Sequence, residues 1–251
     1  MAKVEILGVK IDNLSLQEVL EQINNFVQSK NKHFVVTPNP EFLVAAQKDK
    51  NFKAILNYAD MAVADGVGLN FGAKLLGQRL QRLTGVDLVG YLCELAEQKK
   101  YSVFLVGGQN QVAAKCAQVL RENFPQLPIA GAEGGGEVID NGKNTTDRQL
   151  IEKINQARPR ILLVAFGQGQ QEKWIFHNLD ALASVRVAIG VGGAFDFIAG
   201  EIKRAPVWLQ KIGLEWLYRL IQEPKRWRRI INAVIIFPAL IIKEKIFSKS
   251  P

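Results

Sequence analysis

The chain has 251 residues, of which 48% are hydrophobic and 22% are charged, and this composition excludes an intrinsically disordered protein. Its two cysteines and two histidines are too few for a disulfide framework or a Cys/His metal centre, so we expect no metal and a reducing compartment. No stretch approaches the roughly 20 apolar residues of a membrane-spanning helix, so secretion and ordinary insertion into a bilayer are not expected.

Short β-branched runs alternate with stretches of helical periodicity through the first 195 residues. Strands are predicted at residues 4–6, 34–36, 61–64, 103–106, 161–165 and 187–191. Helices are predicted at residues 15–28, 41–47, 52–58, 86–99, 112–123, 147–157 and 172–179. Ser15 with Glu18, and Thr146 with Gln149, have the spacing of a capping box, which supports two of these helix starts. Strands separated by helices predict a Rossmann-like α/β fold, with a mostly parallel sheet flanked by helices on both faces.

The last fifth of the chain differs from the rest in charge. Residues 199–251 carry 11 Lys and Arg against 4 Asp and Glu, which accounts for nearly all of the net charge of +8. Apolar residues recur there at helical spacing, at Leu214, Leu217, Tyr218 and Ile221. This spacing predicts a helix that buries the stripe and ends at Pro224. We therefore divide the chain into an α/β catalytic body, residues 1–195, and a basic, apolar helical appendage, residues 196–251.

The appendage also contains a nearly continuous apolar block at residues 230–242. Ile235, Ile236 and Phe237 must either pack on another surface or stay exposed, and exposure favours self-association. A basic, amphipathic segment also suits the surface of a membrane that carries anionic lipid. The appendage thus predicts peripheral association with a membrane surface, and a solvated basic face is the alternative.

In parallel sheets, ligands bind beyond the carboxyl ends of the strands, where loops diverge and helix N-termini point outward. Five polar or glycine-rich segments directly follow predicted strands, at residues 37–41, 65–68, 107–108, 166–172 and 192–196. We expect these five loops to meet at one edge of the sheet and to form the ligand site there.

The first of these loops, Thr37-Pro38-Asn39-Pro40, is stiffened by two prolines. Asn39 is a preferred helix cap and Pro40 suits the first turn of a helix, so the loop can simply begin a helix. A rigid loop with a hydroxyl and an amide at a strand end is equally suited to hold a sugar. The sequence leaves both interpretations open.

Asp65 leaves a predicted strand and is followed by Gly66 and Gly68. A carboxylate at this place, with the backbone free to approach a substrate, suits a general base that acts on an alcohol. The alternative is that Asp65 caps a helix that begins near Val67.

Two pairs of glycines, Gly107-Gly108 and Gly192-Gly193, offer backbone amides that suit the diphosphate of a nucleotide. Neither pair completes a G-x-G-x-x-G motif, and the chain contains no P-loop and no Asp-x-Asp pair that holds a divalent ion. A reaction without metal needs cationic side chains to receive the charge of the leaving group. The appendage supplies candidates at Lys203, Arg204, Arg219, Lys225, Arg226, Arg228 and Arg229.

Taken together, these segments resemble the WecG/TagA/CpsF family of glycosyltransferases over nearly the whole chain. The matching stretches are Thr37-Pro38-Asn39-Pro40-Glu41-Phe42, Ala64-Asp65-Gly66-Val67-Gly68, Arg82-Leu83-Thr84-Gly85-Val86-Asp87-Leu88, Phe104-Leu105-Val106-Gly107-Gly108, Gln171-Glu172-Lys173-Trp174, Gly190-Val191-Gly192-Gly193-Ala194-Phe195-Asp196, Arg204-Ala205-Pro206, residues 213–220 and residues 223–226. The chain departs from the family at Gly169, where the family often has proline.

The resemblance implies an inverting transfer of N-acetylmannosamine, or of its uronic acid, from a UDP donor to undecaprenyl-diphosphate-linked N-acetylglucosamine, at the cytoplasmic face of the membrane. The product would be a β-1,4-linked disaccharide lipid for a cell-surface polymer such as teichoic acid. The resemblance also implies that Asp65 is the base and that Thr37, Asn39, Arg82 and Gln171 surround the sugars. By the same pattern, Arg219, Arg226 and Arg229 close the site from the appendage. No cofactor is implied.

Two other classes of protein are compatible with parts of the sequence. One is a dinucleotide- or adenosylmethionine-dependent enzyme on a similar sheet, which the missing G-x-G-x-x-G motif disfavours. The other is a non-enzymatic adaptor that uses the basic appendage to bind nucleic acid or a membrane. The basic residues alternate with isoleucine rather than with aromatic residues that stack on bases, so we expect no specific nucleic-acid binding.

Overall fold

The computed structural model describes residues 3–109, 111–135, 138–139, 143–144 and 147–247. The strands are β1 (Lys3–Ile6), β2 (Val9–Asp12), β3 (His33–Val36), β4 (Met61–Ala62), β5 (Val103–Gly107), β6 (Ile129–Glu133), β7 (Val138–Ile139), β8 (Lys143–Asn144), β9 (Ile161–Ala165) and β10 (Val187–Gly190).

The α-helices of the body are α1 (Leu16–Gln28), α2 (Pro40–Lys48), α3 (Lys50–Tyr58), α4 (Val67–Leu75), α5 (Gly85–Lys99), α6 (Val112–Asn123), α7 (Asp147–Ala157), α8 (Gln170–Asn178) and α9 (Ala194–Ile198). A 3₁₀ turn, η2 (Leu179–Ala181), follows α8. The C-terminal segment contains α10 (Val207–Lys211), α11 (Glu215–Gln222), the 3₁₀ turn η3 (Pro224–Arg226), α12 (Trp227–Ile231), the π-helical turn η4 (Asn232–Ile236) and α13 (Phe237–Phe247).

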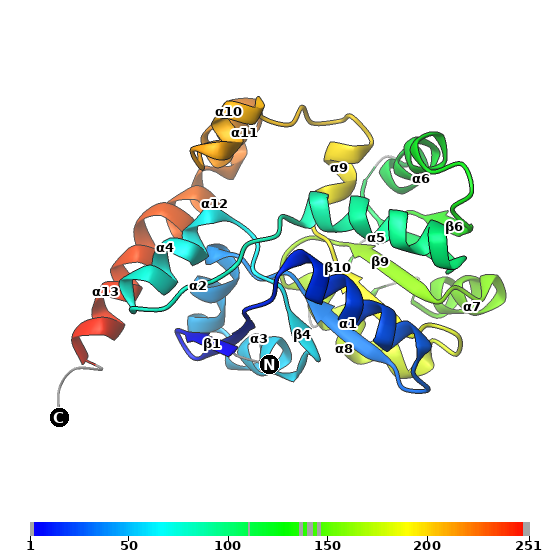
Figure 1. The fold of residues 1–251 in the computed structure, drawn as a ribbon, viewed down its shortest axis with the longest axis horizontal. Coiled ribbons are helices and arrows are strands. Elements are labelled where there is room, and N and C mark those ends of the chain that lie inside the picture. Colours follow the sequence, from blue (N-terminus) through cyan, green and yellow to red (C-terminus); the bar gives the residue numbers. More distant parts are fainter. Residues whose placement is uncertain (1–2, 110, 136–137, 140–142, 145–146, 248–251) are drawn as a thin grey trace.

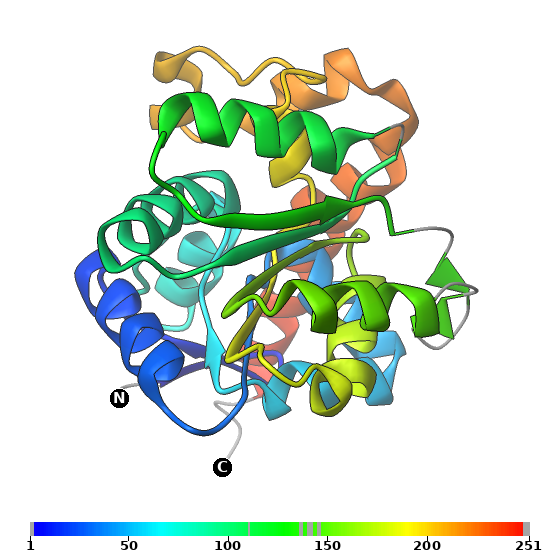
Figure 2. The same cartoon turned by 90° about the vertical axis from the view of Figure 1, so that its right-hand side faces the viewer.

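Six strands form one parallel sheet in the order β4-β3-β10-β9-β5-β6. Helices cover both of its faces, as Figure 2 shows. Successive strand residues alternate between two buried clusters, so Phe34 and Val36 lie on one face whereas Val35 lies on the other. Because both faces are covered, β5, β9 and β10 are buried along their whole length, which is typical of parallel sheets. The predicted fold class is confirmed.

The N-terminal strand, predicted at residues 4–6, is not part of the parallel sheet. It is β1, which pairs antiparallel with β2 in a hairpin that the sequence analysis did not predict. The hairpin meets the sheet beside β4, through a bridge between Asp12 and Val63. The Asp12 carboxylate also accepts a hydrogen bond from the Ala62 N–H at 2.9 Å. The predicted capping box is present at Ser15 and Glu18, whereas Thr146 lies outside the described residues.

The C-terminal segment runs along one side of the body, next to α2 and α4, and is coloured orange to red in Figure 1. Phe237 and Ile241 on α13 are fully buried and belong to the same core cluster as residues of the sheet. Gly72 on α4 makes room for this packing, because a Cβ atom there would lie 2.8 Å from the Phe237 ring. Of the apolar residues 235–237, which were expected either to pack or to stay exposed, Phe237 packs on the body, whereas Ile235 is 59% exposed.

The prediction that α11 buries its apolar stripe is wrong. Leu217 is 38% and Ile221 is 72% exposed, because the opposite side of α11 faces the body. Glu215 and Arg219, one helical turn apart, lie on that inner side and line a cavity. The helix does end before Pro224, as expected. None of the helices in the described part of the chain has the length and apolar character needed to cross a bilayer.

Candidate active site

The candidate site lies at the carboxyl ends of β3 and β10, which are neighbours in the sheet. The chain leaves β3 into α2 on one face of the sheet and leaves β10 into α9 on the other face, as the core clusters of these helices show. Loops that diverge in this way open a crevice between them, and parallel α/β sheets bind ligands in such crevices. The strand order thus determines where the site lies.

A cavity of about 680 Å³ occupies this crevice. The body contributes residues from the loops after β3, β4 and β10, and the C-terminal segment closes the other side. The lining residues include Asn39, Glu41, Asp65, Gly66, Phe71, Arg82, Thr84, Gly85, Gly193, Phe197, Gln210, Glu215, Trp216, Arg219 and Val234. The volume is in the range of pockets that enclose small molecules. Three of the five loops that were expected to converge therefore reach the cavity.

Asp65 lies at the wall of this cavity and does not cap α4. The N-cap of α4 is Gly66, which has a φ of 87° and makes no side-chain cap. The Asp65 backbone is held instead by a hydrogen bond from its N–H to the Pro38 carbonyl at 2.8 Å. Its carboxylate lies against Gly85, the first residue of α5, because a Cβ atom on Gly85 would lie 3.8 Å from Asp65 Oδ2. The Gly85 N–H favours the charged form of this carboxylate. The helix terminus therefore orients the carboxylate toward the cavity.

Burial raises the pKa of Asp65 to about 6, and the negative charge of Glu215 acts in the same direction. The positive charges of Arg82 and Arg219 and the Gly85 N–H oppose this rise. A carboxyl group with a pKa near 6 is largely ionised at neutral pH and is still basic enough to accept a proton. The site thus provides a carboxylate whose pKa suits general-base chemistry.

Two of the predicted cations, Arg82 and Arg219, line the same cavity. Arg219 comes from α11 in the C-terminal segment, where its guanidinium stacks over the Phe197 ring at 4.7 Å and donates to Glu223 at 2.8 Å. Gly193 lets this guanidinium approach, because a Cβ atom there would lie 2.7 Å from its Nη2. The C-terminal segment therefore brings a cation to the end of β10.

The two polar residues of the loop after β3 have different surroundings. Asn39 caps α2, accepting hydrogen bonds from the N–H groups of Glu41 and Phe42, and it also lines the cavity. Both sequence-based interpretations of Asn39 are therefore compatible with its position. Thr37 is buried, and its hydroxyl donates to the Gly190 carbonyl at 2.7 Å. Thr37 does not line the cavity; it fastens β3 to β10 beneath it.

Gln171 is also buried beneath the cavity rather than in its wall. Its side-chain oxygen accepts a hydrogen bond from the Gly192 N–H at 2.9 Å, and its Nε2 donates to Glu172 at 2.6 Å. Gly192 has a φ of 53°, a left-handed conformation that glycine adopts readily. Burial raises the pKa of Glu172 to about 7, although its bonds with Gln171 and the Gly169 N–H oppose the rise. Gln171 thus holds the turn that presents Gly193 to the cavity.

Gly107 and Gly108, at the end of β5, do not line the cavity. Two strands, β9 and β10, separate β5 from β3 in the sheet. Gly107 has a φ of 112°, and a Cβ atom there would lie 2.5 Å from the carbonyl oxygen of Ala165. Close packing of β5 against β9 thus accounts for this glycine, and a role for the pair in substrate binding stays a prediction.

The other two predicted arginines, Arg226 and Arg229, do not line the cavity in this structure. Arg226 pairs with Glu223 at 2.9 Å, so that Glu223 joins it to Arg219. Arg229 on α12 pairs with Glu41 on α2 at 2.6 Å. Their ion pairs connect parts of the C-terminal segment to one another and to the body.

The sequence analysis missed Glu215, a second carboxylate in the cavity wall. It considered only the cations of the appendage, and a single acidic residue in a basic segment was the available signal. It also missed Gln210, Trp216 and Val234, because only the folded chain brings them to the cavity. Among the residues that the structure describes, no three His, Cys, Asp or Glu side chains are placed to hold a metal ion.

The amino-acid sequence also matches a known protein family over nearly its whole length. Residues 4–251 match the model of the family described as "Glycosyl transferase WecG/TagA/CpsF family". The chain belongs to the WecG/TagA/CpsF family of glycosyl transferases. Since the match covers the body and the C-terminal segment, both are parts of the family's chain. The predicted family is confirmed, and the chain is a glycosyltransferase by family.

Three similar proteins share the name "N-acetylglucosaminyldiphosphoundecaprenol N-acetyl-beta-D-mannosaminyltransferase". The protein of Bacillus spizizenii is 36% identical over 217 residues, which cover 86% of this chain and 81% of the relative. The protein of Bacillus subtilis is 33% identical over 237 residues, covering 90% and 89%. The protein of Staphylococcus aureus is 33% identical over 249 residues, covering 97% and 94%. The comparisons give no support to the dinucleotide-dependent enzyme or the non-enzymatic adaptor.

Proposed function

We propose that this WecG/TagA/CpsF family member transfers N-acetylmannosamine from a UDP donor to undecaprenyl-diphosphate-linked N-acetylglucosamine. The names of its relatives support the sugar and the lipid acceptor. The observation that carries the mechanism is the carboxylate of Asp65, which lies beside Gly85 at the wall of a cavity that Arg82 and Arg219 also line.

Asp65 acts as the general base in a single displacement. The carboxylate accepts the proton of the acceptor hydroxyl as that oxygen attacks the anomeric carbon of the donor sugar. The new bond joins the acceptor oxygen to the anomeric carbon, and the bond from this carbon to the donor phosphate oxygen breaks. The bonding electrons leave with UDP. Attack from the face opposite UDP inverts the anomeric configuration.

Arg82 and Arg219 supply positive charge where negative charge grows on the leaving diphosphate. A guanidinium can bind phosphate oxygens through two parallel N–H donors, which stabilises the transition state electrostatically. Arg219 is held by Glu223 and by the Phe197 ring, so its orientation is restricted before substrate binds. Arg226 shares Glu223 with Arg219, and we propose that it turns toward the same anion when the donor binds.

The C-terminal segment would place the site at the cytoplasmic face of the membrane, where the lipid acceptor is located. Large apolar side chains are exposed there on successive elements, among them Trp208 (62%), Ile212 (61%), Ile221 (72%) and Ile235 (59%). Basic side chains accompany them, which suits a surface of anionic lipid. The same apolar surface would favour self-association when no membrane is present.

The central test replaces Asp65 by Asn in the full chain. The assay would supply UDP-N-acetylmannosamine with a short-chain lipid-diphosphate N-acetylglucosamine and would separate the disaccharide product by chromatography. We expect the transfer rate of Asp65→Asn to fall ~10²–10⁴-fold, the usual contribution of a general base. A transfer rate near that of the wild type would show that Asp65 is not the base.

The donor is tested in the same assay by offering the uronic acid form beside N-acetylmannosamine. Turnover of the uronic acid alone would contradict the proposed donor while leaving the class of reaction intact. No transfer with either donor, by a folded wild-type chain on lipid vesicles, would contradict the proposed function itself.

A further inference from the structure

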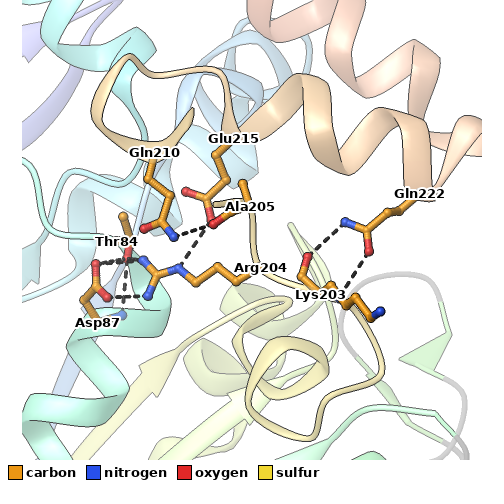
Figure 3. Close-up of polar contacts among 8 residues, drawn as sticks. All are labelled: Thr84, Asp87, Lys203, Arg204, Ala205, Gln210, Glu215 and Gln222. Atoms are coloured by element: carbon orange, nitrogen blue, oxygen red, sulfur yellow. Dashed lines mark hydrogen bonds and ion pairs between the residues drawn. The ribbon is translucent and has the colours of Figure 1, made fainter. Parts of the chain in front are cut away.

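Arg204 forms an ionic bridge between the body and the C-terminal segment beside the cavity (Figure 3). Its Nη1 and Nη2 donate to the two carboxylate oxygens of Asp87 on α5, at 2.7 and 3.0 Å. Its Nε lies 3.5 Å from a carboxylate oxygen of Glu215 on α11. We call these three side chains, with Thr84, the Arg204 bridge.

The body side of the Arg204 bridge is the N-terminus of α5. The Thr84 hydroxyl accepts a hydrogen bond from the Asp87 N–H as the helix cap and donates to the Asp87 carboxylate at 2.6 Å. Arg204 Nη2 lies 3.4 Å from the same hydroxyl. The residue after Thr84 is Gly85, which lies against the Asp65 carboxylate and whose N–H favours its charged form. The Arg204 bridge is therefore one residue away from the donor that orients Asp65.

The other side of the Arg204 bridge is fixed to α10 and α11. The Lys203 backbone exchanges two hydrogen bonds with the side chain of Gln222, at 2.9 and 3.1 Å. The Ala205 carbonyl accepts from Gln210 at 2.7 Å (Figure 3). A shift of Arg204 along α5 would thus displace α11, which carries Glu215 and Arg219 into the cavity wall.

Charge gives the Arg204 bridge a second effect. Burial raises the pKa of Asp87, but the hydrogen bonds from Arg204 and Thr84 outweigh it, so the pKa of Asp87 lies below its usual value. Hydrogen bonding to Asp87 in turn raises the pKa of Arg204. Glu215 and Asp87 are both anionic, and one guanidinium lies between them. Without Arg204, Glu215 would lose the cation that lies 3.5 Å from it, and Asp87 would keep only its bonds with Thr84 and the more distant charge of Arg82.

We infer that Arg204 is a positioning residue: by joining Asp87 to Glu215, it holds α11 and the N-terminus of α5 in the places that the Asp65 carboxylate requires. This inference rests on the proposed function. It assigns no contact with substrate to Arg204, whose role is to act through Gly85 and α11.

Asp65 is faced by charged groups from each element around it. Arg82 comes from the loop before α5, Glu215 and Arg219 come from α11, and Glu41 on α2 is paired with Arg229. Among these groups, the negative charge of Glu215 raises the pKa of Asp65. The Arg204 guanidinium, 3.5 Å from Glu215, partly neutralises the charge of Glu215. Loss of the guanidinium should therefore shift the acid limb of kcat/KM to higher pH.

The test is a double-mutant cycle of Arg204→Gln and Asp87→Asn in the full chain. Each single variant should lower kcat/KM by about tenfold or more, since misplacement of a catalytic group by about 1 Å can cost up to ~10²-fold. The double variant should be no worse than either single variant, because both remove the same bridge. Additive losses, or single variants with unchanged kcat/KM, would overturn the inference.

The pH profile separates positioning from mere structural support. Arg204→Gln should move the acid limb upward, whereas Arg204→Lys should keep the limb in place and lose kcat/KM, because lysine keeps the charge without the paired donors. An acid limb that does not move in Arg204→Gln would contradict the electrostatic part of the inference. The matched control is Lys115→Gln. It breaks an exposed ion pair between Lys115 on α6 and Glu201, which lies three residues before Arg204, and it should behave as wild type.

A readout without transfer distinguishes failure of this inference from failure of the proposed function. Backbone hydrogen exchange should accelerate in residues 207–222 of Arg204→Gln and not in Lys115→Gln. If the wild-type protein has no transfer activity but exchange is faster in Arg204→Gln and not in Lys115→Gln, the proposed function is refuted and the Arg204 bridge is supported. Unchanged exchange in Arg204→Gln would refute the bridge, whatever the activity.

Discussion

The Asp65→Asn variant should lose transfer activity. Its free energy of unfolding should rise relative to that of the wild type as the pH increases from acid to neutral. Burial favours the neutral form of Asp65 in the folded chain and raises its pKa from 3.8 to about 6. The unfolded chain therefore ionises at lower pH than the folded chain, and the Asp65 carboxyl opposes folding increasingly as the pH rises from about 4 to about 6. Asparagine does not ionise and has no such pH dependence.

The size of this effect follows from the two pKa values. Between about pH 4.5 and about pH 8, the free energy of unfolding of Asp65→Asn should rise relative to that of the wild type by about 2 kcal/mol. For a chain of this size, such a change corresponds to about 4–8 °C in the midpoint of thermal unfolding. Comparing two pH values removes the constant difference in packing between Asp and Asn.

The assay is urea unfolding of both proteins at the two pH values, followed by circular dichroism. The matched control is Asp49→Asn, because the hydrogen bond from the Phe52 N–H and the contact with Lys173 lower the pKa of Asp49. Its folded-state pKa is shifted in the opposite direction, so Asp49→Asn should show no relative gain as the pH rises. A relative stability of Asp65→Asn that is independent of pH would refute the claim that Asp65 is a desolvated carboxylate.

Two further predictions concern the C-terminal segment. Gly72→Ala should reduce the free energy of unfolding by about 1–3 kcal/mol in denaturant titrations, because the new Cβ would lie 2.8 Å from the Phe237 ring. Gly90→Ala, in an open position of α5, should instead increase it by about 0.5–1 kcal/mol, and equal effects would contradict the described packing. Trp208→Ser and Ile212→Ser should weaken sedimentation with anionic vesicles without changing the midpoint of unfolding, since both side chains are exposed; undiminished binding would contradict membrane contact through this surface.

Much of the fold could be predicted because its strands and helices have strong local signals. The buried strands β5 and β9 are uninterrupted apolar runs, and their predicted bounds agree with the structure to within a residue. β6 was missed, because Ile129–Glu133 is a half-exposed edge strand with a glycine and two alanines, which lacks that apolar pattern. β2 was missed for a similar reason, since four residues in a hairpin give no clear periodicity.

The candidate site could be predicted only in part. Asp65 lies three residues after β4 and Gly193 three residues after β10, so the rule that ligands bind at the carboxyl ends of strands identified them. Thr37 and Gln171 also follow strands, yet their side chains turn inward and bind the backbone of Gly190 and Gly192. The sequence could not reveal this direction, because it depends on which strand lies alongside.

The amino-acid sequence by itself determined the fold class, the family and the aspartate at the end of the fourth strand, since these depend on short-range patterns and on motifs in chain order. The tertiary structure alone decided the order of the strands, which places β10 beside β3 and keeps the end of β5 away from the cavity. It also decided the orientation of α11, which directs Glu215 and Arg219 inward and leaves Ile221 in contact with solvent. Both outcomes depend on packing between residues far apart in the chain, and periodicity along a single helix or strand carries no information about its partner.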